Sequence, residues 1–159
     1  MILIATDGVE ISASGDSKDK LVNFGVSTKQ NVDGKDVLLT ANYNRLKKKL
    51  GGSAKVAVDD TTVKFEYNNV DKDALLSVSQ KLDSSNTVKP TISLTTGDMC
   101  YGWTRSWTGG SVESTFRPGD RVDVEWKDNG ANGVWTTRAE IPVNDHAATK
   151  ISFSRDFNY

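Results

Sequence analysis

The sequence predicts an all-β protein, an antiparallel β-meander of about 10–12 short strands joined by hairpin turns. Apolar and polar residues alternate along most of the chain, which is the period-two pattern of strands with one apolar face. Turn residues rich in Gly, Asp and Asn separate these alternating stretches. No stretch has the spacing of a long amphipathic helix. A curved sheet, a sandwich and a barrel all fit this pattern.

The order of the alternating stretches places the predicted strands. Eight of them precede the last third of the chain, at residues 9–13, 22–26, 37–43, 54–58, 63–67, 76–82, 92–96 and 99–107. Four more short strands are expected between residues 109 and 157. The basic run of Arg45, Lys47, Lys48 and Lys49 lies between two strands, so we interpret it as a solvated strand end, bulge or turn, with a single helical turn as the alternative.

Length and composition limit the class of protein. A chain of 159 residues favours a single β domain over residues 1–159. A hydrophobic fraction of 36% suits a sheet with one dry face better than a helical bundle. The net charge of −1 gives no overall attraction to nucleic acid, which is not an expected partner. The first five residues, MILIA, are too short for a signal sequence or a membrane helix, and whether a targeting peptide has been removed stays open.

An internal repeat relates residues 51–94 to residues 109–153. Gly51, Gly52 and Ser53 recur as a second Gly-Gly-Ser at residues 109–111. One added residue in the following turn brings Val63, Phe65 and Tyr67 onto a second strand of the same pattern, Val122, Val124 and Trp126. Because the turn lengths also agree, we interpret the two segments as copies of one unit that stack or close upon each other.

The stretch SVESTFRPGDRVDVEWKD and the aromatic-rich end KISFSRDFNY resemble, at the level of strand pattern, the outer-envelope porins of plastids and the porins of mitochondria. The resemblance covers mainly residues 109–159. It implies a β-meander or a small porin-type membrane barrel and a plastid location. It equally suits an algal plastid protein bound to a larger assembly, such as a photosystem accessory subunit or a pyrenoid-shell component. No functional residue is transferred from these families.

A membrane barrel and a water-soluble sheet differ in the apolar height that their strands require. Most strands offer only three or four apolar positions on one face, whereas a membrane strand needs roughly nine to eleven residues with an apolar outer face. Arg105 and Arg155 are in phase with the apolar residues of their strands, and an arginine at the bilayer centre costs about 2–4 kcal/mol. These two features favour a water-soluble sheet.

No pattern of residues indicates catalysis, a metal site or a cofactor. His146 lies in a polar turn, and the carboxylates Glu125 and Glu140 have no partner acid at the spacing of a glycosidase. Cys100, the only cysteine, excludes an intrachain disulfide and is expected on the face opposite Met99 and Tyr101, without a base nearby. We therefore expect a non-enzymatic protein without cofactor or metal.

Five aromatic residues form the candidate partner or ligand surface: Tyr101, Trp103, Trp107, Trp126 and Trp135. They fit either a ring-lined surface for a pigment, lipid, sugar or protein chain, or a sheet core filled by large side chains. Trp107 is the best candidate for exposure, because it ends its strand.

The first expected function is therefore that of a non-catalytic structural or accessory protein. It would dock on other subunits or associate with itself, and the resemblance implies a plastid or photosynthetic assembly. The alternatives are a β-barrel that binds a lipid or pigment, and a small porin-type membrane barrel.

Overall fold

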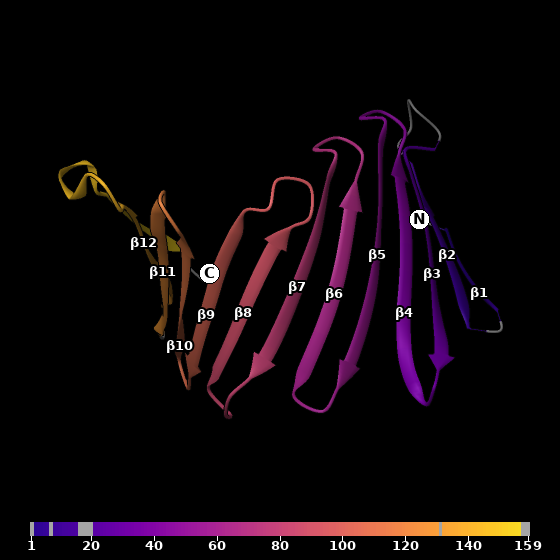
Figure 1. Ribbon diagram of the computed structural model, residues 1–159, viewed down its shortest axis with the longest axis horizontal. Coiled ribbons are helices and arrows are strands. Elements are labelled where there is room, and N and C mark those ends of the chain that lie inside the picture. The colour runs from indigo at the N-terminus through magenta and orange to yellow at the C-terminus, as the bar shows by residue number, and fades with distance from the viewer. Residues whose placement is uncertain (1, 7, 16–20, 131, 157–159) are drawn as a thin grey trace. The chain divides into compact units, whose positions relative to one another are not determined.

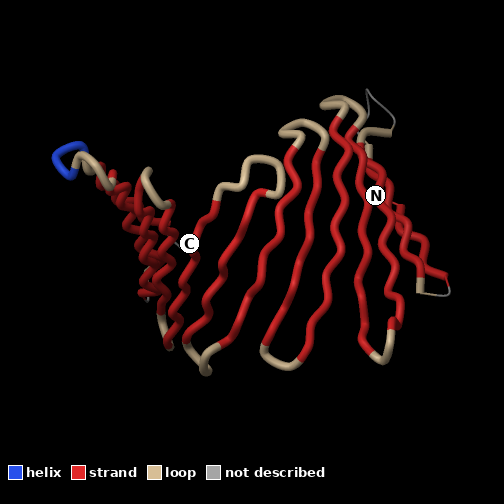
Figure 2. The backbone as a smooth tube through the Cα atoms, in the orientation of Figure 1, coloured by secondary structure: helices blue, strands red, loops and turns tan. Residues whose placement is uncertain are grey.

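The computed structural model describes residues 2–6, 8–15, 21–130 and 132–156. Within them the chain is all-β, and 13 strands follow one another in a single antiparallel order, each hydrogen-bonded to the next (Figure 1; Figure 2). The predicted antiparallel meander is confirmed. In this order β1 and β13 each have one neighbour, so the sheet is open.

The strands of the first part of the order are β1 (Ile2–Thr6), β2 (Val9–Ser14), β3 (Asn23–Val32), β4 (Lys35–Asn44), β5 (Lys49–Val58), β6 (Thr61–Asn68) and β7 (Asp73–Lys81). Those of the second part are β8 (Asn86–Ser93), β9 (Met99–Trp107), β10 (Gly110–Arg117), β11 (Arg121–Gly130), β12 (Gly133–Pro142) and β13 (Lys150–Asp156). The 13 strands exceed the 10–12 that the sequence predicts. The unpredicted strand is β1, whose five residues are mostly apolar and therefore show no alternation.

The described residues form two compact units. Unit 1 consists of Met1–Val78 and Ile92–Asp98, and unit 2 consists of Ser79–Thr91 and Met99–Tyr159. Unit 1 contains β1 to β6 and most of β7, and unit 2 contains β9 to β13 and most of β8.

Tight turns fix the register of the hairpins in unit 1. Asp33 and Gly34 both have positive φ, of 51° and 77°, in the two-residue turn between β3 and β4. Two successive positive φ angles are typical of the type I′ turn, whose twist matches that of antiparallel strands. Lys48 also has a positive φ, of 48°, at the end of the turn that connects β4 to β5. The basic run is thus a turn that leads into a strand, as expected, and not a helical turn.

The pairing of β9 to β13 fixes the register in unit 2. Trp103 lies opposite Ser114 on β10, and Ser114 lies opposite Val124 on β11. Residues that lie opposite each other share a face of the sheet, so the register assigns each side chain of unit 2 to one of two faces. His146 begins a short 3₁₀ helix, His146–Ala148, in the connection from β12 to β13.

The sheet has no buried apolar layer among its described residues. No hydrophobic side chain described is buried, and the buried polar side chains are those of Ser77, Ser93 and Thr136. Within each unit the strands form a single layer, so the unit itself supplies no second layer to cover either of its faces. Backbone pairing between neighbouring strands therefore defines the fold, and the apolar face stays exposed.

The strands of the predicted repeat occupy matching places in the order. Segment 51–94 supplies part of β5 and then β6 to β8, and segment 109–153 supplies β10 to β12 and most of β13. Gly52 on β5 lies opposite Tyr67, and Gly110 on β10 lies opposite Trp107. The duplication itself stays a prediction.

Among the glycines whose surroundings the structure describes, Gly110 has the least free space. A Cβ atom built on it lies 2.6 Å from the carbonyl oxygen of Lys127 and 2.8 Å from two ring atoms of Trp107. The missing side chain thus allows the indole of Trp107 to lie over the strand, an arrangement in which an aromatic ring covers a glycine on a neighbouring strand.

We expect Gly110→Ala to lower the free energy of unfolding by about 1–3 kcal/mol, since a backbone carbonyl cannot move aside for the added methyl group. Urea unfolding of the full chain, followed by tryptophan fluorescence, measures the effect. Gly130→Ala is the matched control, because the atom nearest to its Cβ is a carbonyl oxygen at an ordinary 3.5 Å. Equal losses in the two variants would contradict the steric explanation.

Candidate functional site: two opposite faces

The predicted aromatic surface lies on one face of unit 2. Register places Tyr101, Trp103 and Trp107 of β9 on the same face as Trp126 of β11 and Trp135 of β12. The five side chains are exposed by 44%, 37%, 42%, 55% and 49% respectively. Trp107 is thus one of five exposed rings. The alternative of a buried aromatic core is wrong for these five residues.

Further apolar residues complete this face, which we call the apolar face of unit 2. They are Val112, Phe116, Val122, Val124, Ala139, Ile141, Ile151 and Phe153. Phe153 is the most exposed of them, at 71%. Sequence reasoning did not include these residues in the candidate surface, because only the register of five strands shows that they are continuous with the tryptophans.

Ring contacts give this face some order. Trp107 and Trp126 meet edge to face, with ring centroids 6.2 Å apart and planes at 85°. Tyr101 and Phe116 stack with centroids 6.3 Å apart. Such pairs add about 0.5–1.5 kcal/mol beyond their burial, so the rings hold one another in place while their outer surfaces stay exposed.

Both arginines that sequence phase assigns to this face lie near the same ends of their strands. Arg105 is opposite Val112 and two residues from the end of β9. Arg155 is opposite Trp135, one residue from the end of β13, and its guanidinium carbon lies 4.9 Å from the centroid of that ring. Arg155 therefore lies in the row of Trp107, Asp128 and Trp135 at one end of this face, and Arg105 lies one row further in, level with Trp126 and Phe153.

The opposite face of unit 2 is polar and ion-paired. Glu125 of β11 accepts bonds from the Lys127 ammonium at 2.6 Å and from Arg138 Nε at 2.5 Å. Asp123 pairs with Arg121 Nε at 2.9 Å and with Arg117. The lysine hydrogen bond, followed by that of the arginine, lowers the pKa of Glu125 below its usual value. Cys100 is on this face, as predicted, since its neighbour Tyr101 lies on the apolar one.

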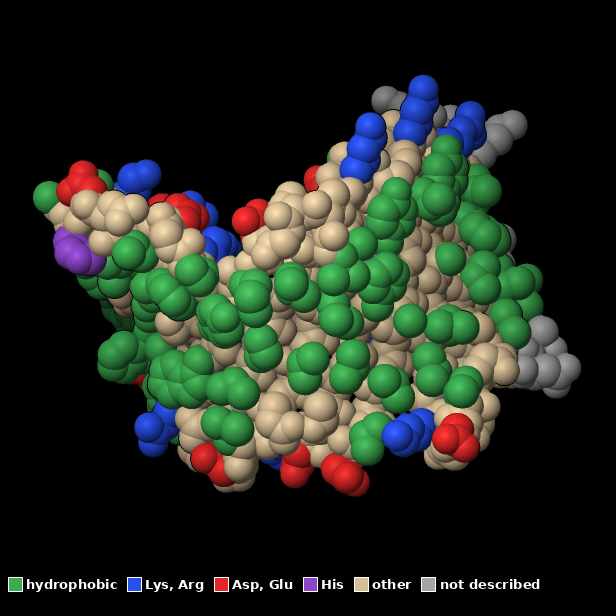
Figure 3. All heavy atoms as spheres, in the orientation of Figure 1, with side chains coloured by type: hydrophobic (Ala, Val, Ile, Leu, Met, Phe, Trp, Pro, Cys, Tyr) green, Lys and Arg blue, Asp and Glu red, His purple; other side chains and the backbone are tan. Residues whose placement is uncertain are grey.

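Unit 1 has the same division into two faces. Its apolar face carries aliphatic and aromatic side chains on β1 to β6: Ile4, Val9, Ile11, Phe24, Val26, Val37, Leu39, Tyr43, Leu50, Val56, Val63, Phe65 and Tyr67. Figure 3 shows hydrophobic side chains spread over the strands of this unit. Its polar face carries residues such as Glu10, Ser27, Thr40, Ser53 and Lys64.

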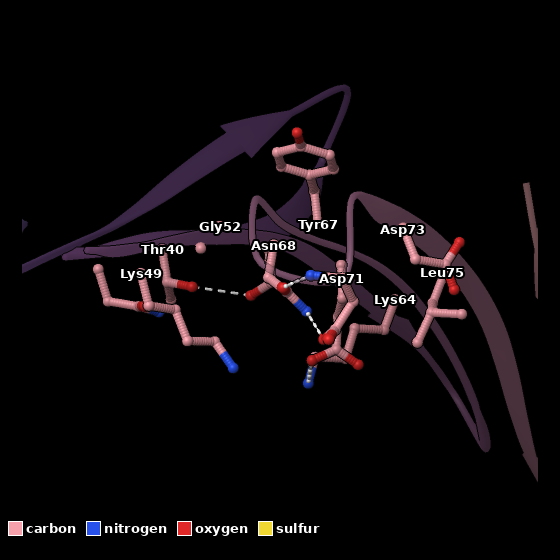
Figure 4. Close-up of a pocket in the computed structure, with 13 residues that line it drawn as sticks. Thr40, Lys49, Gly52, Lys64, Tyr67, Asn68, Asp71, Asp73 and Leu75 are labelled. Carbon is pink, nitrogen blue, oxygen red and sulfur yellow. Dashed lines mark hydrogen bonds and ion pairs between the residues drawn. The ribbon is translucent and has the colours of Figure 1, made fainter. Parts of the chain in front are cut away.

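A hollow of about 530 Å³ lies mainly on the polar side of β4 to β7. Gly51 and Ser53 leave space there, and Lys64 and Glu66 form an ion pair of 2.7 Å in its lining. Figure 4 shows Asn68 bonded to Asp71, while the Tyr67 ring extends to the other side of the ribbon from Lys64. The Lys64–Glu66 ion pair and the Asn68–Asp71 bond make the lining of the hollow polar.

Metal-binding and membrane-helix signals are absent from the part of the chain that the structure describes. No group of three or more His, Cys, Asp or Glu side chains there is arranged to hold a metal ion. No helix among those residues is long and apolar enough to cross a bilayer. Comparison with known proteins gives no match to a family model, a curated protein or a solved structure.

We expect Glu125→Gln to lower stability at pH 7 and to make less difference in acid. Because the folded-state pKa is lowered, the carboxylate stabilises the fold above its unfolded pKa of about 4.3, and this contribution is lost as pH falls through the lower folded value. Urea unfolding of both proteins from pH 7 to pH 3 measures the convergence. Glu140→Gln is the control, since Glu140 forms no ion pair with another described residue. A gap that stays constant with pH would contradict the assignment.

Proposed function

We propose that this protein is a membrane-inserted β protein of porin type, whose apolar face contacts lipid hydrocarbon and whose polar face contacts water. The outer edges of β1 and β13 are paired with other strands in this proposal, because unpaired N–H and C=O groups of a strand edge are not tolerated in hydrocarbon. The observation that carries the proposal is the separation of apolar and ion-paired side chains onto opposite faces of a single layer with no buried hydrophobic side chain described. Contiguous apolar surface of this extent needs a cover. Lipid hydrocarbon covers it without requiring a complementary shape.

Strand length supports the same proposal. Five strands, β3, β4, β5, β11 and β12, have 10 residues each. A strand of this length extends about 33 Å, and transmembrane strands use roughly nine to eleven residues. Most strands have only three or four apolar residues on one face. This number is about half of the residues of a full-length strand, because alternate residues point to the opposite face.

The position of Arg155 on the apolar face of unit 2 weakens part of the objection to charged residues in lipid. Arg155 lies near a strand end beside Trp135, and Arg105 lies one row further in, on the same strand as Trp107. An arginine near the membrane interface costs about 0–1 kcal/mol, far less than at the midplane. Tryptophan rings favour that same depth. The resemblance of the strand pattern to plastid and mitochondrial porins also supports a membrane location, which is a plastid membrane in this proposal.

A second candidate is a structural or accessory subunit, for instance of a plastid assembly, whose apolar face is covered by another protein or a second copy. The observation that favours it is β13, which has one neighbour and carries the highly exposed Phe153. The outer edge of such a strand offers N–H and C=O groups for a strand of another chain. Tryptophan, tyrosine and arginine are also the residues enriched at protein interfaces. Both candidates are non-catalytic.

Adjacent residues of β9 distinguish the two candidates, because Trp103 and Thr104 point to opposite faces. We expect a cysteine at Trp103→Cys, in a Cys100→Ser background, to be protected from a charged water-soluble maleimide after the full chain is reconstituted into neutral phosphatidylcholine vesicles. Labelling should slow by about tenfold or more, since a charged reagent does not enter hydrocarbon. The matched Thr104→Cys variant should stay reactive.

Detergent-free protein in water gives the reference rate for both cysteines. Equal labelling of the two variants in vesicles would refute the lipid-facing proposal. Slow labelling of Trp103→Cys in water, reversed by dilution, would instead support self-association, which light scattering then measures.

A further inference from the structure

We infer that one end of the unit 1 strands is an anionic-lipid contact, in which a group of basic turn residues binds the phosphates of phospholipid headgroups. This inference deepens the proposed function and rests on it for the position of the apolar face. The group, called the basic end, consists of Arg45, Lys47, Lys48 and Lys49 from the β4–β5 connection and Lys72 from the β6–β7 connection.

Antiparallel order brings these residues to one end of the unit. The connections from β4 to β5 and from β6 to β7 lie at the same ends of their strands, because β5 and β6 pair antiparallel between them. Asn69 ties the two connections together. Its side chain accepts a 2.7 Å bond from the Leu50 N–H and donates a 3.1 Å bond to the carbonyl oxygen of Lys48.

Charge is divided between the two ends of the unit 1 strands. The turns at the other end contain Asp33 in the β3–β4 turn and Asp59 and Asp60 in the β5–β6 turn. Figure 3 shows basic side chains beyond the upper ends of these strands and acidic ones mainly along the lower ends. Two acidic side chains near the basic end, those of Asp71 and Asp73, already accept hydrogen bonds. Asp71 accepts from Asn68 at 2.7 Å, and Asp73 accepts from Ser93 at 2.6 Å.

The basic end adjoins apolar and aromatic side chains at the limit of the apolar face. Tyr43 lies opposite both Phe24 and Leu50 in the last apolar row before the β4–β5 turn, and Tyr67 lies near the end of β6. Each basic connection also carries one exposed aliphatic residue, Leu46 at 57% and Val70 at 56%. At the acidic end the corresponding rows contain Val32, Val37, Val56 and Val58.

Tyrosines with exposed aliphatic residues beneath a group of lysines match the layers of a membrane interface. Aromatic rings favour headgroup depth, lysine stems lie along apolar surface, and ammonium groups reach the phosphates. Basic residues next to a membrane are attracted to anionic lipid, and each contributes roughly a fivefold change in partitioning. The acidic end is repelled by the same surface. The inferred contact therefore orients unit 1 relative to an anionic leaflet.

The test uses the triple variant Arg45→Gln, Lys47→Gln and Lys48→Gln, whose altered side chains are all exposed. Its control is the triple variant Lys29→Gln, Lys35→Gln and Lys55→Gln, which removes the same charge elsewhere in unit 1. Co-sedimentation of each full chain is measured with phosphatidylcholine vesicles and with vesicles containing about one-third phosphatidylglycerol. We expect the basic-end variant to lose the preference for anionic vesicles by roughly 25-fold or more, and the control and wild type to keep it.

Protection of the Trp103→Cys cysteine from the maleimide in neutral vesicles tests the proposed function separately. Protection together with an unchanged anionic preference in the basic-end variant overturns the inference and leaves the proposed function standing. Basic-end-dependent binding to anionic vesicles without protection supports the contact and overturns insertion. Absence of vesicle binding overturns both. A short DNA duplex is the remaining control: if the basic-end substitutions weaken DNA binding more than anionic-vesicle binding, the lipid assignment is wrong.

Discussion

Hydrogen bonding between neighbouring strands is the interaction on which the rest of this structure depends. Each of the 13 strands pairs with the next in the chain, and these backbone ladders take the place of a hydrophobic core. Since side chains alternate between the faces of a strand, the ladders also determine which side chains share a face of the sheet. Apolar residues gather on one face of each unit and charged residues on the other.

This arrangement changes how the apolar residues can be buried. A globular domain buries its apolar residues against itself, whereas a single layer leaves that burial to its surroundings. The polar face can meet water directly, and ion pairs such as those of Glu125 stabilise part of it. The apolar face is incomplete, and exposed rings such as Trp126 gain most from a cover. The proposed lipid contact and the alternative protein contact would each cover the exposed apolar face.

The sequence is sufficient to predict most of the strands and the two faces. The alternation of Val122, Val124 and Trp126 places them on one face, and the phase of Arg105 and Arg155 places both arginines there too. It does not predict the exposure of that face, because alternation says which residues share a side and not whether another layer covers it. It also does not show at what height on that face the two arginines lie, since that requires the register of neighbouring strands.

The basic run between β4 and β5 shows the same limit of prediction from the sequence. Sequence places Arg45 and Lys47 between two strands but gives no reason to connect them with Lys72. Only antiparallel order and the two bonds of Asn69 bring these connections together. Conversely, β1 escapes prediction because its residues, ILIAT, are apolar without alternation, and only pairing with β2 identifies it as a strand.

The strictly sequential order of the strands has a consequence for how the chain folds. Most sheets with many strands join segments that are far apart in the chain, and closing those long loops slows folding. Here every ladder forms between strands that are consecutive in the chain, so each hairpin is a local event on the timescale of about 1–10 μs. The chain can therefore assemble hairpin by hairpin from more than one starting point. During this growth the edge strand always has unpaired N–H and C=O groups. The partly assembled sheet is therefore the state most prone to aggregation.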